Sequence, residues 1–471
     1  MQALKTEPNA RAGIMATETT ATALNIDHLN ELVEGGDRTR LRLLLNDQHA
    51  ADLTEALQEL DMQNRMFCFR LLDLDNASAV LAEMDRDNQR VLLRGLGNIG
   101  MVPIVSAMSA DDAADFLSEL PQEEAQSIIS QLDDDDAIGD IYELMSFKED
   151  TAGGIMSTDY LAVPANTTAS EVLEMLRSQY EQVDEEIYDL FVIDGSAKLV
   201  GYLSVKDLLT APPDDSIESL MDRQVISVSV DTDQEEAAER LSRYDLLSLP
   251  VVDANGVLRG VITADDAMDV LQEEADEDVF QASGIGTTDV AETLSHSVRQ
   301  AFRARLPWLV VTLLIESGSA AVITHFDSVI QQTVIAASFM PLLTSVTGSV
   351  AMQSTCIVIR NARKQWTLRA IFRNCWHEMR VGMMLGAACA LLATCVSAVF
   401  RMQSNLGLIV GTSLFLTMSI GVLIGTLIPI CFDRLGIEPA HASGPLITSL
   451  LDVCTMTIYL SIVHTFLSMV S

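Results

Sequence analysis

Two carboxylates lie inside long apolar windows in the second half of the chain. Glu316 interrupts Leu306–Ile323, and Asp452 lies in Ser443–Val470 together with His464. Placing an ionisable group in hydrocarbon is energetically costly, so such a residue is a functional candidate by default. No basic residue in these windows can neutralise Asp452. We therefore interpret Asp452 as a cation ligand, with a local helix cap or ion pair as the structural alternative.

The neighbours of these two acids suggest different roles. Asp452 follows Gly444 and Pro445 by about two helical turns, and this pair would break the helix and free backbone carbonyl oxygens. Glu316 could line a water-filled path or be hydrogen-bonded in its protonated form. We favour local hydrogen bonds for Glu316, with candidate partners Thr312, Ser317 and Ser319.

The elements that hold both acids are predicted membrane spans. About 20 apolar residues cross the ~30 Å of bilayer hydrocarbon. Five windows meet this length with at most one acid each: Leu306–Ile323, Thr333–Ile359, Val381–Phe400, Leu406–Phe432 and Ser443–Val470. Basic residues gather before the first window and between the second and third, which predicts that both segments face the cytoplasm. Five spans then leave the C-terminus outside.

Charge divides the chain at the same place. Residues 1–299 hold 19 Lys/Arg and 61 Asp/Glu, a net charge of −42, whereas residues 300–471 hold ten and six, a net charge of +4. The acidic half makes a nucleic-acid partner unlikely. The apolar half excludes a purely soluble enzyme and a fully disordered acidic protein. We expect a multidomain protein with an acidic cytosolic body and a membrane domain.

The first 150 residues predict a mobile N-terminus over residues 1–24 and a helical domain over residues 25–150. A sequence pattern of small and aliphatic residues recurs and ends each time in an acidic residue or a proline that would terminate a helix. It occurs at Ala50–Asp61, Asn76–Asp85 and Asp111–Pro121. Units of this kind stack into a solenoid-like helical domain. The acidic run Asp133–Asp136 is either an accessory cation cluster or a helix cap.

Residues 151–275 contain a tandem repeat. Leu190–Leu209 aligns with Leu249–Met268 at an offset of 59, so that Asp207 matches Asp266. Each copy predicts a strand, a tight turn, a second strand and a helix that begins at a Ser/Thr-x-x-Asp cap. A further strand and helix precede each pair. Two such α/β copies resemble a CBS-domain pair. Residues 276–305 then predict a connecting helix that leads into the first span.

The whole layout resembles the MgtE family of magnesium channels and transporters. Four local sequences carry the resemblance: EDTAGGIM at Glu149–Met156, LPWL at Leu306–Leu309, PLLTSVTG at Pro341–Gly348 and EPAHASGPLITSLLD at Glu438–Asp452. The family usually has a Gly-Asn-x-Gly-x-Gln run in the second span. Only Gly348 and Gln353 of that run are present here, so helix contact or ion passage at this level is expected to differ.

The resemblance implies a homodimeric, Mg²⁺-selective channel for magnesium uptake through a five-helix domain at residues 306–471. Asp452 takes the role of the pore acid, and its counterpart in the second subunit would face it across the two-fold axis. Cytosolic acids would bind regulatory Mg²⁺ and close the pore. The positions that match this pattern are Asp111, Gly154, Asp233, Glu235, Asp245, Asp266, Glu274, Glu277, Asp278 and Glu438, the last replacing an Asp of the family.

Other functions stay open at this stage. CBS pairs often bind adenine nucleotides, and Thr263 and Asp266 stand where a ribose-binding pair would lie, so ATP is a candidate ligand. A broader Mn²⁺ or Co²⁺ transporter is an alternative, as is a membrane-anchored CBS sensor that transports nothing. No nucleotide-hydrolysing P-loop or hydrolase motif occurs, so we expect no enzyme. The bacterial inner membrane is the expected location.

Overall fold

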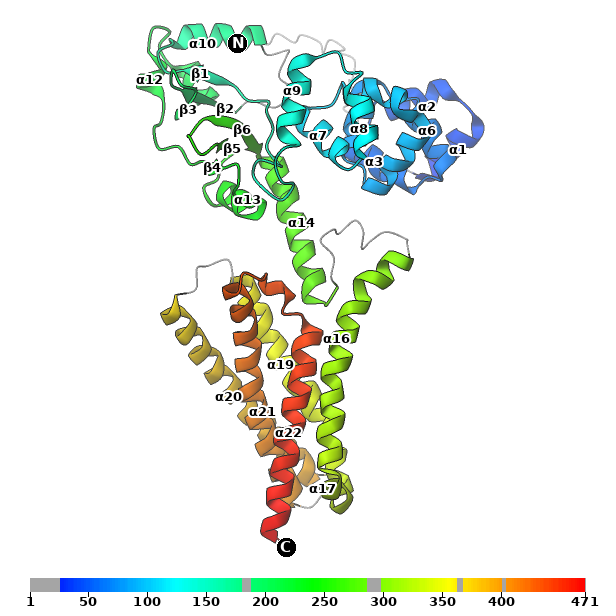
Figure 1. Ribbon diagram of the computed structural model, residues 1–471, viewed down its shortest axis with the longest axis vertical. Helices are drawn as coiled ribbons and strands as arrows, with labels where there is room; N and C mark the ends of the chain where they lie inside the picture. Colours follow the sequence, from blue (N-terminus) through cyan, green and yellow to red (C-terminus); the bar gives the residue numbers. More distant parts are fainter. Residues whose placement is uncertain (1–25, 180–187, 286–297, 362–366, 400–403, 471) are drawn as a thin grey trace, which may run out of the picture. The chain divides into compact units, whose positions relative to one another are not determined.

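The structure, a computed structural model, describes residues 26–179, 188–285, 298–361, 367–399 and 404–470. The predicted mobile segment 1–24 and part of the predicted connecting helix lie outside these residues. The chain divides into two compact units, Met1–Met268 and Asp269–Ser471. Each unit is described separately below, with its elements labelled in Figure 1.

The first unit begins with a domain of short helices. The three segments with the recurring sequence pattern form helices α3 (Ala50–Glu59), α5 (Leu74–Ala82) and α7 (Ala110–Ser118). The acid that follows one helix caps the next, because its carboxylate accepts backbone N–H groups that otherwise have no partner. Asp61 caps in this way the helix α4 (Met62–Phe69), and Asp85 caps α6 (Arg86–Val105). The remaining helices are α1 (Ile26–Gly35), α2 (Arg38–Leu45), α8 (Gln122–Ile129) and α9 (Asp135–Leu144).

These helices stack in two alternating rows. Helices α3, α5, α7 and α9 contact one another in that order, and α2, α4, α6 and α8 form the second row. Each helix turns leucine and other aliphatic side chains into the space between the rows, where Leu53, Leu81 and Leu117 are fully buried. The predicted solenoid-like stacking is therefore present, and it places α7 between α5 and α9 in its row.

The rest of the first unit consists of two small α/β copies. The first contains β1 (Ala162–Pro164), α10 (Ala169–Gln179), β2 (Asp189–Ile193), β3 (Leu199–Ser204), α11 (Val205–Thr210) and α12 (Ile217–Leu220). The second contains β4 (Val228–Ser229), α13 (Gln234–Arg243), β5 (Ser248–Val252), β6 (Leu258–Thr263) and α14 (Ala264–Ala282). In each sheet the first strand pairs parallel with the second, which pairs antiparallel with the third.

The two copies repeat each other in detail. Asp189 pairs with Ser204 in the first sheet, and Ser248 pairs with Thr263 in the second, so both residues of the pair are shifted by 59. The register shift at Val192/Ile193 also recurs at Val251/Val252. The predicted order of strands and helices is confirmed.

The second unit carries the apolar helices. Within the described residues, five helices are long and apolar enough to cross a membrane. They are α16 (Val298–His325), α19 (Met340–Asn361), α20 (Leu368–Val399), α21 (Ser404–Arg434) and α22 (Gly444–Val470), with α17 (Asp327–Gln332), α18 (Val334–Ala337) and the 3₁₀ turn η1 (Pro439–His441) between them. Figure 1 shows these long helices in yellow-green to red.

Small residues set the spacing of these helices. A Cβ atom on Gly425 of α21 would lie 2.4 Å from the carbonyl oxygen of Ala351 on α19, so only glycine permits this approach. The Thr355 hydroxyl donates to the Gly425 carbonyl oxygen at 2.9 Å and secures the contact. On α22, the buried Tyr459 donates its hydroxyl to the carbonyl oxygen of Ala336 at 2.7 Å. These two hydroxyl groups thus find carbonyl acceptors on neighbouring segments of the same unit.

One predicted boundary is wrong. The sequence window for the third span begins at Val381, but α20 begins at Leu368. Arg369, Arg373 and Arg380 therefore lie on a helix and not in a loop. Hydropathy averaging ends a window at such residues, whereas a helix tolerates them near its end because long arginine side chains can reach polar surroundings.

Candidate functional site

The predicted pore acid lies on α22, the last helix of the second unit. Gly444 and Pro445 are the first two residues of α22, so the pair marks a helix start. Their carbonyl oxygens are not free of side-chain donors. The Thr448 hydroxyl donates to Gly444 at 2.9 Å, and the Ser449 hydroxyl donates to Pro445 at 2.8 Å.

Asp452 lies one turn beyond Thr448 and is half-buried. Its carboxylate forms no hydrogen bond or ion pair with any residue that the structure describes, so the local cap or ion pair has no partner there. The neighbouring α19 approaches this part of α22 closely, since a Cβ on Gly348 would lie 3.3 Å from the Thr448 methyl carbon. Gly348, retained from the family run, thus brings two helices together one turn before the acid.

The local hydrogen bonds expected for Glu316 are wrong. The Ser317 hydroxyl donates to the Leu313 carbonyl oxygen, and the Thr312 hydroxyl donates to that of Leu309. The third candidate, Ser319, has a buried hydroxyl with no hydrogen-bond partner in the part of the chain that the structure describes. Hydroxyl groups on a helix reach their own preceding turn easily, which removes them as partners of a longer acid. Two residues beyond Glu316, a Cβ atom on Gly318 would lie 3.2 Å from the Val453 side chain of α22, so the two helices pack closely at the level of Glu316 and Asp452.

A third membrane carboxylate was missed from the sequence. Glu378 of α20 is only 5% exposed and accepts a hydrogen bond from the Ser354 hydroxyl of α19 at 3.0 Å. The apolar windows leave residue 378 in the basic connection between the second and third predicted spans. The signal that could have found it is a helical pattern that continues through residues 368–380 despite the arginines.

Two predicted sensor residues meet in the first unit, where α7 lies against the second α/β copy. Asp111 of α7 lies near enough to Asp266 at the start of α14 to contribute to the raised pKa of Asp266. Burial raises the pKa of Asp111, and the Oδ1 atom of that carboxylate is buried without a hydrogen-bond partner among the described residues. Burial also raises the pKa of Asp266 to about 6, with a smaller contribution from Asp111, while the Thr263 hydroxyl opposes the shift by donating at 2.5 Å.

Two further acids of α7, missed from the sequence, belong to this acidic cluster, which we define as Asp111, Asp112, Asp115 and Asp266. The pKa of Asp112 is raised by burial and, less strongly, by Asp266 and Glu83. The pKa of Asp115 is raised to about 7, mainly because the surrounding protein removes water although the side chain reaches the surface, and then by Asp111 and Asp112. Like charges and an orphaned buried oxygen make a favourable environment for a divalent cation.

Other predicted sensor residues lie around α13. The carboxylate of Asp233 caps this helix by accepting the backbone N–H of Glu235 at 3.0 Å. The loop that contains Gly154 runs beside this cap, through the bridge between Thr151 and Asp233. Asp245 follows the opposite end of α13, with a backbone φ of 53°. The structure therefore brings Gly154 near Asp233 but separates both from Asp245.

The remaining predicted sensor residues belong to the second unit. Glu274, Glu277 and Asp278 lie on α14, and Glu438 precedes η1. Gln281 joins two of them, because its amide nitrogen donates to Glu277 Oε1 at 2.6 Å and to Glu438 Oε2 at 2.8 Å. No search of sequence spacing would have found this contact, since Gln281 and Glu438 are 157 residues apart.

Among the described residues, no three His, Cys, Asp or Glu side chains form a group that could hold a metal ion. The acids meet as pairs or as loosely coupled sets. Mg²⁺ keeps several of its waters and needs only one or two carboxylates, so paired acids suit it better than a closed cage would.

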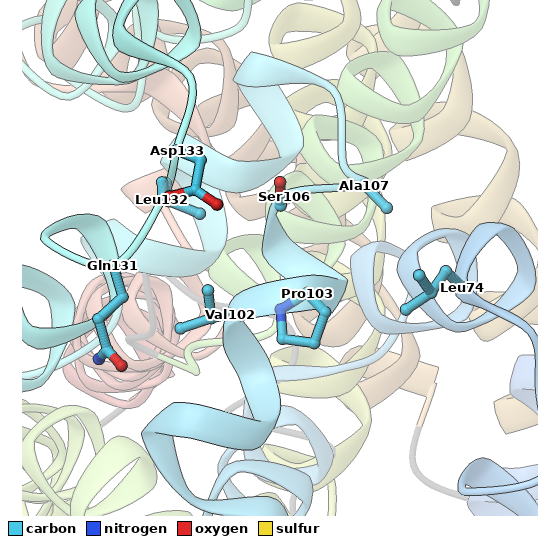
Figure 2. A pocket seen from close by; sticks show the side chains of 8 residues that line it. All are labelled: Leu74, Val102, Pro103, Ser106, Ala107, Gln131, Leu132 and Asp133. Carbon is cyan, nitrogen blue, oxygen red and sulfur yellow. The ribbon is translucent and has the colours of Figure 1, made fainter.

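A hollow in the helical domain is not part of these sites. It is lined by side chains of α5, α6 and the segment after α8, shown in Figure 2: Leu74, Val102, Pro103, Ser106, Ala107, Gln131, Leu132 and Asp133. Asp133 is the only carboxylate of this lining. The adjacent Asp134 caps α9 by accepting the N–H groups of Asp136 and Ala137. The helix-cap interpretation of the run Asp133–Asp136 thus holds for Asp134.

Comparison with known proteins covers nearly the full chain. Residues 340–462 match the MgtE family, described as divalent cation transporter, residues 48–150 match the MgtE intracellular N domain, and residues 152–214 and 217–273 match the CBS domain. The magnesium transporter MgtE of Bacillus subtilis is 34% identical over 441 residues, which cover 91% of this chain and 97% of the relative. The chain belongs to the MgtE family.

Further relatives of this MgtE chain support the same family. The magnesium transporter MgtE of Thermus thermophilus is 33% identical and covers 94% of this chain and 98% of its own. A crystal structure of the cytosolic domain of the Mg²⁺ channel MgtE in complex with ATP is 35% identical, with a TM-score of 0.50, and covers 52% of this chain and 99% of that chain. The expected family, the CBS pair and the five apolar helices are confirmed. The chain is a membrane protein with an intracellular N-terminal domain.

Proposed function

We propose that this MgtE chain is a Mg²⁺ channel that takes up magnesium through its five-helix domain, with Asp452 as the acid that holds the passing ion. The observation that carries the proposal is the Asp452 carboxylate itself, half-buried on an apolar helix with no hydrogen-bond or ion-pair partner among the described residues. A carboxylate in this setting attracts a cation, and Mg²⁺ would pass with much of its hydration shell. The relatives named as magnesium transporters support the choice of ion.

The channel acts as a homodimer in the bacterial inner membrane, with its C-terminus outside. One Asp452 from each subunit then forms a pair across a two-fold axis, which doubles the charge that one ion meets. The basic residues on the first turns of α20 support the orientation, because such residues favour the cytoplasmic side.

Internal Mg²⁺ closes the channel by binding between acids. Without the ion, the acidic cluster carries like charges whose repulsion opposes close packing of α7 on the second CBS copy. With the ion, the orphaned Asp111 Oδ1 atom and the Asp266 carboxylate gain a common cation. The other positions that match the family's pattern act in the same way. We assign this role to Gly154, Asp233, Glu235, Asp245, Glu274, Glu277, Asp278 and Glu438.

Replacing Asp452 by Ala tests the pore assignment. The purified chain is reconstituted into liposomes, and influx of Mg²⁺, Mn²⁺, Co²⁺ and Ca²⁺ is compared. We expect Asp452→Ala to abolish divalent influx, while Asp327→Asn, which neutralises an exposed acid of α17, leaves it unchanged. Normal flux through Asp452→Ala would refute the pore role. Equal influx of all four ions would support the broader transporter, and no influx in the unsubstituted chain would support the non-transporting sensor.

ATP is a second ligand that we propose for the CBS pair, supported by the ATP-bound relative structure. Thr263 and Asp266 remain the candidate ribose-binding residues of this site. ATP should raise the thermal unfolding midpoint of the full-length protein, because a ligand that binds only the folded state stabilises it. An unchanged midpoint at millimolar ATP would count against the site.

A further inference from the structure

The end of α14 meets the start of α22 through one glutamine. Gln281 is 5% exposed, and its amide nitrogen donates one hydrogen bond to each of two carboxylates, Glu277 of the same helix and Glu438 of the segment before α22. An amide nitrogen carries two N–H groups, so both donors are used. A neutral side chain thereby holds two negative groups at hydrogen-bond distance from a single atom.

The other half of this amide has no partner. The Oε1 atom of Gln281 is buried and accepts no hydrogen bond from any described residue. An unsatisfied buried acceptor is unfavourable, so a cation or a cation-bound water that this oxygen could contact would stabilise the fold. A carbonyl oxygen next to two carboxylates is the kind of donor set that Mg²⁺ prefers.

Neighbouring contacts join this cluster to the helix that carries Asp452. Gly284, at a backbone φ of 77°, packs on Pro445, whose Cγ atom would lie 3.2 Å from an added Cβ. His441 Nδ1 lies 3.6 Å from Glu438 Oε2, and the His441 ring lies 6.3 Å from the ring of Trp308 on α16. Gln281 therefore lies three residues before a glycine that contacts the first turn of α22.

We propose that Gln281 is a reversible clasp that competes with Mg²⁺ for Glu277 and Glu438. Without the ion, the amide nitrogen holds the two carboxylates. When Mg²⁺ binds them, the amide turns over about its last side-chain bond, so that Oε1 replaces the nitrogen and becomes a ligand or accepts from a bound water. Rotation about this terminal bond has two broad, nearly equivalent positions, so the exchange needs no movement of the backbone.

This inference rests on the proposed closure by internal Mg²⁺ and adds to it a residue that sets the required concentration. The two carboxylates are near enough for one hydrated ion because both contact the same nitrogen. The amide donors favour the ion-free state, and the amide oxygen favours the ion-bound state. Substitutions that keep only one of these two functions should therefore act in opposite directions.

Two substitutions separate the functions. Gln281→Glu keeps the oxygens and removes the donors, so the Mg²⁺ concentration for half-maximal effect should fall about tenfold. Gln281→Lys keeps donors and removes the acceptor oxygen, so that concentration should rise about tenfold or the response should vanish. Losses of this size are typical when a group that orients a metal ligand is changed. Gln272→Glu and Gln272→Lys, on an exposed position of the same helix, are the matched controls for added charge.

The measurement uses full-length protein and has two readouts. Mg²⁺ binding is followed by Trp308 fluorescence, after subtraction of the signal of Trp308→Phe, and closure is followed by flux into liposomes. The clasp is supported if the Gln281 pair shifts both readouts in opposite directions and the Gln272 pair shifts them less than twofold. Shifts in the same direction, no shift, or equal shifts in the Gln272 pair would overturn it while leaving closure by Mg²⁺ intact. A wild-type protein that does not respond to Mg²⁺ would overturn both.

Discussion

The two CBS copies share one scaffold but have different neighbours. In both, the second and third strands pair in the same register, and the following helix begins at a hydroxyl that bonds to an Asp carboxylate. Ser204 donates to Asp207 at 2.7 Å in the first copy, and Thr263 donates to Asp266 at 2.5 Å in the second. Asp207 is exposed, whereas Asp266 lies in the acidic cluster with α7.

A second position shows the same contrast. Arg259 of the second copy donates to Glu143 of α9 at 3.0 Å and to Asp253 at 3.2 Å, whereas the matching residue of the first copy is Val200. The repeat therefore supplies a symmetric frame, and contact with the helical domain makes one copy different from the other. A capping carboxylate becomes a candidate sensor only where other acids surround it.

The strongest test of this contrast neutralises the matched acids. Asp266→Asn removes one negative group from the acidic cluster, so we expect the Mg²⁺ concentration that half-maximally stabilises the full-length protein to rise about tenfold or more. Asp207→Asn makes the same change at the exposed position and should leave that concentration unchanged. Thermal unfolding over a Mg²⁺ titration measures both. Equal responses of the two variants would show that the copies do not differ in this way.

The raised pKa values of the acidic cluster predict that the stability of the folded protein depends on pH. An acid whose pKa is higher in the folded than in the unfolded state binds more protons when folded, so stability falls as pH rises between the two values. For Asp115, with a pKa of about 7, and Asp266, with a pKa of about 6, this window runs from about pH 4 to 7. The metal-free protein should lose about 2 kcal/mol of stability across it, after allowance for solvent screening.

Variants of the acidic cluster and of the exposed Asp207 test the origin of this pH effect. Asp115→Asn combined with Asp266→Asn should flatten the decline in the unfolding midpoint between pH 5 and pH 7.5, measured with a chelator present. Asp207→Asn should leave the decline as it is. A decline that persists unchanged in the double variant would assign it to the general acidity of the chain and not to the acidic cluster.

Sequence alone predicted the features that depend on local pattern. The offset of 59 predicted two copies with the same order of strands and helices, because strands, turns and helix caps are set by local sequence. The acidic breakers Asp61 and Asp85 cap helices because their carboxylates need only the next turn. The apolar windows predicted five spans because hydrocarbon thickness sets their length. Asp111 and Asp266 were both predicted, on family resemblance, and the structure brings them together.

Features that depend on distant contacts were missed. Glu378 looked like part of a basic loop, yet a hydroxyl on α19 holds it inside the helical domain. Asp112 and Asp115 belong to no motif that singles them out in the sequence, and only the surrounding protein raises their pKa values. Gln281 has no chemical signal of its own in the sequence. Its role emerges only when two acids from separate segments are placed on either side of its amide.

The smallest expected effect concerns the ion pair that distinguishes the second copy. Arg259→Val gives this copy the residue of the first, and it should lower stability by at most about 1 kcal/mol, because the pair with Glu143 is partly exposed and screened by salt. The loss should shrink at 1 M salt, as measured by thermal unfolding of the full-length protein. Among the residues that the structure describes, the first copy offers Asp194 at the equivalent turn but no counterpart of Glu143, so Val200→Arg, the reverse exchange, should give no gain. A loss above about 2 kcal/mol that does not respond to salt would show that the Arg259 side chain acts through packing, and the contrast between the copies would then rest on shape as well as charge.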